Sequence, residues 1–269
     1  MKRILMMASM LLCIAASAQT AEEFKEKYNR QVRNTGAAGV GVETILDKWL
    51  EAYPGDCDAL EGRFAYYWAK SRKTEVVAKD SKKYLGTNPV LTLKDSLGNP
   101  VYYFEEPFFD ESLFAESTKN IEEAIKLAPT ALEYRFDKIN ALIDYEKDSP
   151  DMAATELLNL IDYDSKSHPM WYLRGESVGP EDFETAIQEY CYTFYNLNTP
   201  NGYNSFKIVS EKMSSLHPSN PDWLANIGAY YQVAKKDNKK ATKYYKKALK
   251  LDPNHFAANR NMKIMEKNK

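Results

Sequence analysis

The chain has 269 residues, of which 44% are hydrophobic and 28% charged, and its 36 Lys and Arg nearly balance 38 Asp and Glu. This length and hydrophobic content suffice to bury a continuous core and exclude a disordered chain, while the balanced charge gives no basic surplus for nucleic acid. Glycine is scarce at 11 residues, and helix formers are plentiful, so we expect a globular, helix-rich protein.

Residues 1–18, MKRILMMASMLLCIAASA, have the composition of a secretory signal peptide. Lys2 and Arg3 precede an apolar run of about the usual length, and Ala16-Ser17-Ala18 forms a small-x-small cleavage site. A lipoprotein signal built on Cys13 ranks below this interpretation, because Leu12 stands where such signals carry a small residue. We therefore expect export through a cleaved signal, to the bacterial periplasm or the medium.

No later apolar run approaches twenty residues, so we expect no transmembrane span in the exported chain.

The Cys57 and Cys191 of the exported chain would lie in an oxidising compartment. The helical patterns predict a series of helix pairs in which Cys57 opens the first helix of pair one and Cys191 lies in the first helix of pair three. Another first helix separates them, so they lie roughly 16 to 20 Å apart, which is too far for a disulfide. We predict two free thiols, with Cys191 buried on an apolar stripe.

The first helical patterns cover residues 21–33 and 43–53, and a third begins near residue 56. This third segment contains ALEGRF, which recurs almost unchanged as ALEYRF and places Phe64 and Phe136 72 residues apart. Each copy follows a proline that stops a preceding helix, Pro54 and Pro129. The two segments therefore look like equivalent first helices of two helix pairs, at residues 56–128 and 130–162.

The stretch at about 72–108 is predicted to be a non-helical insertion within the first pair. Its segment PVLTLKDSLGNPVYYFEE has two β-rich runs around a turn at residues 95–99, which indicates a β-hairpin. Because an isolated two-stranded hairpin is only marginally stable in water, we expect it to pack on the helices or on a partner.

Two more helix pairs follow, at residues 179–217 and 221–252, before a capping helix at about 255–267. In the last pair Ile227-Gly228 and Tyr231 are followed by Ala241 and Tyr245, and Pro253 ends the second helix. This order resembles the tetratricopeptide repeat, a helix-turn-helix unit of about 34 residues. Leu224 stands for the usual tryptophan of that repeat, and the turn is one residue longer.

The resemblance implies an all-α fold: a right-handed superhelix of about four tetratricopeptide-like helix pairs in a single domain, residues 19–269. It also implies a non-enzymatic scaffold whose first helices line a concave groove for a peptide or protein partner. Carried over onto this sequence, the groove positions are Arg63, Tyr66, Lys70, Tyr134, Arg135, Lys138 and Asn226. Arg63 and Arg135 could each form two parallel hydrogen bonds with a carboxylate of the partner, or they could pair with local acids such as Glu61 and Glu133.

The sequence carries no catalytic motif, phosphate loop or spaced ligand set, so we expect no catalytic residue, metal or cofactor. The three histidines, His168, His217 and His255, are expected to be solvated loop residues. The alternative function is a carbohydrate-binding accessory protein of the cell envelope, suggested by 19 tyrosines and an aromatic loop expected at residues 194–206. The protein-binding function is favoured, since most tyrosines fall on helical stripes that predict burial.

Overall fold

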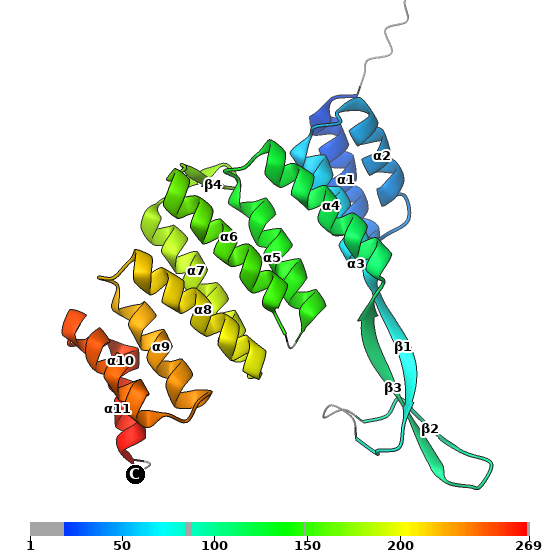
Figure 1. Ribbon diagram of the computed structural model, residues 1–269. Coiled ribbons are helices and arrows are strands. Elements are labelled where there is room, and N and C mark those ends of the chain that lie inside the picture. Colours follow the sequence, from blue (N-terminus) through cyan, green and yellow to red (C-terminus); the bar gives the residue numbers. More distant parts are fainter. Residues whose placement is uncertain (1–18, 84–87, 148, 268–269) are drawn as a thin grey trace, which may run out of the picture.

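The computed structural model describes residues 19–83, 88–147 and 149–267. Within them the chain forms a stack of antiparallel helices, confirming the all-α prediction (Figure 1). The predicted signal peptide, residues 1–18, lies outside the described residues. The helices are α1 (Ala21–Thr35), α2 (Val42–Ala52), α3 (Cys57–Ser71), α4 (Glu111–Leu127), α5 (Leu132–Glu146), α6 (Asp151–Ser167), α7 (Pro180–Asn196), α8 (Pro200–Leu216), α9 (Pro221–Val233), α10 (Asn238–Leu251) and α11 (Phe256–Lys267).

The helix pairs lie where the sequence predicts them. Consecutive helices pack as α3 with α4, α5 with α6, α7 with α8 and α9 with α10, while α1 with α2 leads the stack and α11 ends it. In Figure 1, α4, α6 and α8 lie in front of α5, α7 and α9. The stack thus has two layers, one of first helices and one of second helices.

The last pair shows how the repeat pattern produces close packing. Ala241, Tyr245 and Ala248 are fully buried on one stripe of α10. A Cβ at Gly228 of α9 would lie 2.6 Å from Cε1 of Tyr245, so only glycine lets the tyrosine ring reach the α9 backbone. Gly228, Ala241, Tyr245 and Ala248 thus take the packing positions that the tail motif predicts.

Inside the stack, a continuous core runs from α3 to α9. It contains Leu60, Phe64, Leu157, Ile187 and Phe206, each no more than 6% exposed. Separate buried clusters hold α1 and α2 onto α3, and α11 onto α9 and α10. Each helix pair buries one face against its neighbour because a single hairpin cannot cover both of its faces.

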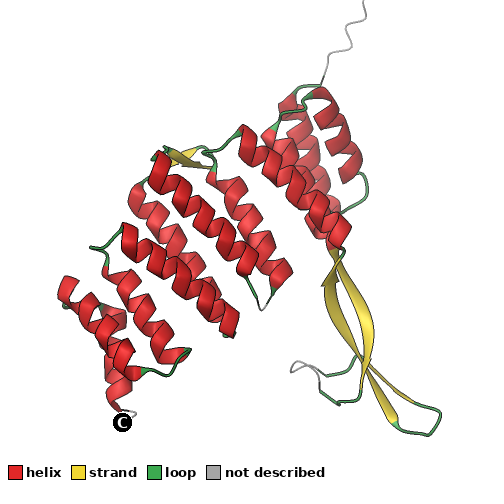
Figure 2. Cartoon of the chain, in the orientation of Figure 1, coloured by secondary structure: helices red, strands yellow, loops and turns green. Residues whose placement is uncertain are grey.

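The insertion forms a three-stranded antiparallel sheet, one strand more than the predicted hairpin (Figure 2). Strands β2 (Leu91–Lys94) and β3 (Pro100–Phe109) are the predicted pair, and Asp95 closes their turn by accepting the amides of Leu97 and Asn99. The additional strand is β1 (Arg72–Lys79), which pairs with β3 along its whole length. We call residues 72–109 the arm.

The arm projects from the stack and is anchored at its base (Figure 1). Arg72 forms an ion pair with Asp144 of α5, and the Lys147 ammonium donates to the Pro107 carbonyl at 2.8 Å. The ring of Phe109 lies 5.4 Å from that of Tyr145 in an edge contact. The root of the arm is therefore packed on the helices.

A second hairpin, which the sequence did not predict, lies between α6 and α7. It consists of β4 (Trp171–Leu173) and β5 (Glu176–Val178), joined by the two residues Arg174 and Gly175. Both turn residues have positive φ, 51° and 86°, which is the geometry of a tight two-residue hairpin turn. This turn points the Arg174 side chain back toward α3.

Candidate functional site

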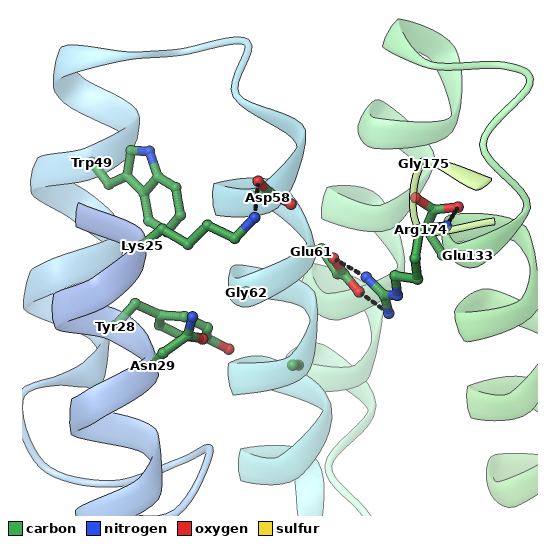
Figure 3. Close-up of a pocket in the computed structure, with 11 residues that line it drawn as sticks. Lys25, Tyr28, Asn29, Trp49, Asp58, Glu61, Gly62, Glu133, Arg174 and Gly175 are labelled. Atoms are coloured by element: carbon green, nitrogen blue, oxygen red, sulfur yellow. Dashed lines mark hydrogen bonds and ion pairs between the residues drawn. The ribbon is translucent and has the colours of Figure 1, made fainter. Parts of the chain in front are cut away.

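A cavity of about 590 Å³ lies between α1, α3 and the start of α5, on the layer of first helices. The tip of the β4–β5 hairpin forms one of its walls (Figure 3). We call it the α1/α3/α5 cavity. It is lined by Lys25, Tyr28, Asn29, Trp49, Asp58, Glu61, Gly62, Ala65, Glu133, Arg174 and Gly175.

The wall formed by α1 and α2 is fixed by hydrogen bonds to the start of α3. Asp56 caps α3 by accepting the Ala59 amide at 3.1 Å, and it also accepts from Nε1 of Trp49 at 3.0 Å. Two residues further along, the Asp58 carboxylate lies 2.8 Å from the Lys25 ammonium. The two aspartates thus set the position of α1 and α2 relative to α3.

Arg174 spans the cavity from the hairpin to α3. Its Nη1 and Nη2 lie 2.9 and 2.7 Å from the two carboxylate oxygens of Glu61, and its backbone amide donates to Glu133 at 3.2 Å (Figure 3). A paired fork of this kind is the strongest geometry for a guanidinium and a carboxylate. The Arg174 side chain is 58% exposed and the Glu61 side chain only 18%. The cation is therefore the accessible half of the pair.

Asp137 of α5 lies beside this ion pair, 3.9 Å from the Arg174 guanidinium. Burial, then a hydrogen bond with Glu61 and the charge of Glu61, raise the pKa of Asp137 to about 7; Arg174 opposes this, and Glu133 adds the smallest effect. Glu61, Glu133 and Asp137 thus lie around a single guanidinium beside the α1/α3/α5 cavity.

The predicted groove residues of α3 lie against α2 instead. Arg63 donates to the Asp47 carboxylate at 2.7 Å, and the Tyr66 hydroxyl donates to Glu43 at 2.7 Å. The Lys70 ammonium donates to that hydroxyl at 2.8 Å. Arg63 thus pairs with a local acid, although with Asp47 rather than with Glu61.

The predicted groove residues of α5 are also engaged within the chain. Tyr134 is buried, and Arg135 donates to the Pro129 carbonyl at 3.0 and 3.2 Å while lying over the ring of Tyr163. Arg135 does not use Glu133, the local acid that the sequence suggested. The Lys138 ammonium sits 3.0 Å from the carboxylates of two second helices, Glu122 on α4 and Glu156 on α6.

Asn226 of α9 is 7% exposed and exchanges hydrogen bonds with Gln188 of α7 at 2.9 and 3.3 Å. The structure thus distributes the seven predicted residues over three places: the α2 side of α3, the surroundings of α5, and the α7–α9 contact. The described lining of the α1/α3/α5 cavity includes none of them. Their role in ligand binding stays a prediction.

The sequence did not predict the residues that meet in the cavity, above all Arg174 and Glu61, or Asp137 beside them. A usable signal was present in WYLRGESV, where aromatic and apolar residues flank an Arg-Gly pair suited to a two-residue turn. The sequence did not indicate which residues the turn would contact, because Glu61 is 113 residues away in sequence.

Two other predictions were wrong. Residues 194–206 are not an aromatic loop: Thr199 and Pro200 start α8 there, and Phe194 and Phe206 are buried between α7 and α8. His255 is not a solvated residue. It is 7% exposed, contacts Asp222 at 2.8 Å and accepts the Ala258 amide, which caps α11.

The cysteines agree with the prediction: Cys57 and Cys191 are both free, and Cys191 is fully buried on α7. In the described part of the chain, no cluster of three or more His, Cys, Asp or Glu side chains is arranged to hold a metal ion. The described helices also include none with the length and apolarity needed to cross a membrane.

No protein-family model matches the chain, and no curated protein matches it. Among solved structures it is similar to YrrB, described as a TPR protein with an unusual peptide-binding site, at 14% identity over 91% of this chain and 93% of that one, with a TM-score of 0.40. A MamA protein is similar at 15% identity over 87% and 93%, with a TM-score of 0.41. MamA from Desulfovibrio magneticus RS-1 is similar at 13% identity over 89% and 99%, with a TM-score of 0.39.

The helix pairs themselves carry the assignment of the fold. Four pairs occur at the predicted positions, and the last one has glycine, tyrosine and alanine in the packing roles that the motif requires. The chain has a tetratricopeptide-like helical repeat fold.

Proposed function

We propose that the protein is an exported, non-enzymatic scaffold that binds a segment of a partner protein at the α1/α3/α5 cavity. The observation that supports this most directly is the ion pair between Arg174 and Glu61. An exposed guanidinium on a hairpin tip neutralises a shielded carboxylate on the cavity wall. A lysine or arginine of a partner would make the same contact once Arg174 has moved away.

The surroundings of Glu61 favour a basic partner side chain. Glu133 and Asp137 lie close to the same guanidinium as Glu61, so three acidic side chains surround one cation. A second guanidinium or ammonium would gain charge-assisted hydrogen bonds there. Tyr28 on the opposite wall is partly exposed and offers apolar surface to the stem of such a side chain.

Peptide binding tests this proposal. A library of extended peptides displayed against the protein should enrich sequences with lysine or arginine, and Glu61→Gln should reduce their affinity about tenfold by removing the charge. Arg174→Gly should increase the affinity, since it removes the competing guanidinium and suits the positive φ of the turn. Glu181→Gln, at an exposed glutamate of α7 outside the cavity, is the matched control. Enrichment without basic residues, or affinities insensitive to Glu61→Gln, would contradict the proposal.

Export is tested separately. Fractionation of a bacterial host should recover the chain outside the cytoplasm, and mass spectrometry should find Gln19 at its N-terminus. Cytoplasmic recovery of the uncleaved chain would refute this part. The carbohydrate-binding alternative loses its expected aromatic loop, because Phe194 and Phe206 are buried and Tyr195 and Tyr203 are partly buried in α7 and α8.

A further inference from the structure

The outermost strand of the arm presents an edge with no described strand beside it. The sheet order is β1-β3-β2, so β1 pairs with β3 on one side only. Along β1 the residues from Arg72 to Val76 are exposed, and Val76 is 60% exposed. An edge strand eight residues long is a template for pairing with another strand unless it is blocked.

Two side chains of opposite charge lie at equal distances from Val77 on β1. Glu75 lies two residues before it and Lys79 two residues after it, with Val76 and Ala78 between them. If a second β1 runs antiparallel with Val77 opposite its own copy, each Glu75 faces the other Lys79. Each Val76 then faces the other Ala78. Opposite charges and apolar pairs directly across a ladder stabilise an antiparallel contact.

Symmetry restricts the competing registers. A two-fold axis that pairs two identical edges stands perpendicular to the sheet, so only residues on the same face can lie opposite each other. A register centred on Glu75 sets that carboxylate against itself, and one centred on Val76 sets Lys73 against Lys79. A register centred on Thr74 matches Lys73 with Glu75, but it places Arg72 opposite Val76 and leaves Val77 unpaired.

We propose that a second copy of this chain pairs with β1 of the first, antiparallel and centred on Val77, joining the two arms into one continuous six-stranded sheet. Lys79 already lies 3.4 Å from Glu106 on β3, so the incoming Glu75 would complete an acidic pair around this ammonium. The interaction would cover Val76, which is 60% exposed in the single chain.

Lysines on an edge strand can also serve to repel other strands. If the lysines have only that role, the protein stays monomeric, and exchanging positive and negative charges between two chains does not bring them together. Glu75 and Lys79 carry opposite charges at equal distances from Val77, and this predicts the opposite behaviour. Reversing one charge should break the contact, and reversing its counterpart on the other chain should restore it.

Charge reversal tests the pairing in the intact protein. Sedimentation should show a concentration-dependent dimer for the wild type, and monomers for Glu75→Lys and for Lys79→Glu separately. Mixing these two variants should restore dimers, because every opposed pair is then Lys with Glu. Lys73→Glu, whose counterpart would fall beyond the end of β1, is the matched control and should still form dimers. Circular dichroism establishes that each variant is folded.

A cysteine cross-link tests the register. Val77→Cys should form a disulfide-linked dimer under mild oxidation, whereas Thr74→Cys and the wild type with its Cys57 and Cys191 should not. A wild type that stays monomeric at every concentration would overturn the proposal. So would a mixture of the folded charge variants that fails to dimerise, or dimers that cross-link through Thr74→Cys instead.

Discussion

Arg174 and Glu61 form a two-pronged ion pair, with nitrogen to oxygen distances of 2.7 and 2.9 Å, that joins the β4–β5 hairpin to α3. It brings together parts of the chain 113 residues apart. Because α3 belongs to the first helix pair and the hairpin follows the second, the contact ties neighbouring repeats along the wall of the α1/α3/α5 cavity.

Removing this ion pair should loosen the hairpin without unfolding the stack. Arg174→Gly should speed amide hydrogen exchange at residues 171–178 while changing the free energy of unfolding by less than about 1 kcal/mol, since the guanidinium is largely exposed. Arg174→Lys keeps the charge but not the fork, and we expect an intermediate rate. Equal exchange rates in all three proteins would show that the ion pair does not hold the hairpin.

Asp137 should make the stability depend on pH. Its pKa is raised to about 7, so folding takes up a proton between about pH 4 and about pH 7, and stability from this group is lost as pH rises through that window. Asp137→Asn cannot titrate, and its urea midpoint should fall less than that of the wild type between about pH 5 and about pH 8. Asp182→Asn, at an exposed aspartate of α7, should follow the wild type. Parallel pH profiles for wild type and Asp137→Asn would refute this prediction.

Lys138 should contribute measurably to stability. Its ammonium lies between Glu122 and Glu156, and its side chain is only 13% exposed. Lys138→Ala leaves two carboxylates facing each other, and we expect a loss of about 1–2 kcal/mol in urea unfolding. Lys119→Ala removes an exposed pair within α4 and should cost less than about 0.5 kcal/mol. Equal losses in the two variants would contradict the structural role.

Gly228→Ala should destabilise the last helix pair. Its Cβ would lie 2.6 Å from the buried ring of Tyr245, and the overpacking should cost about 1–3 kcal/mol, offset in part by the better helix propensity of alanine. At Gly62 a Cβ would meet the side-chain ends of Leu46 and Tyr28, at 2.9 and 3.1 Å, which can shift. Gly62→Ala should therefore lose less in thermal unfolding. A neutral Gly228→Ala would show that the close contact is dispensable.

Much of the fold is readable from the sequence because helix pairs are local. Apolar residues at helical spacing, prolines at helix ends and the turn at residues 95–99 depend on neighbours within a few turns. These signals predicted the pairs, the capping helix and the β2–β3 turn. They missed β1, whose residues carry no turn signal of their own and become a strand only by pairing with β3.

The residues of the α1/α3/α5 cavity could not be predicted from the sequence in the same way. A helix in a stack is covered on more than one side, and periodicity says which residues share a stripe without saying which neighbour that stripe will meet. Glu61 and Arg63 are two residues apart, so their side chains point about 200° apart around α3. Tertiary structure turned Glu61 toward the α1/α3/α5 cavity and Arg63 toward Asp47 of α2.

The sequence by itself therefore determined the repeat architecture, since each helix pair is encoded by local spacing and by its own caps. Only the tertiary structure decided which face of each helix meets α2, α4 or the β4–β5 hairpin, because that choice depends on packing between residues far apart in the chain. The meeting of Arg174 with Glu61 belongs to this second kind of information: a two-residue turn aims the side chain, and the stacking of two repeats supplies its carboxylate.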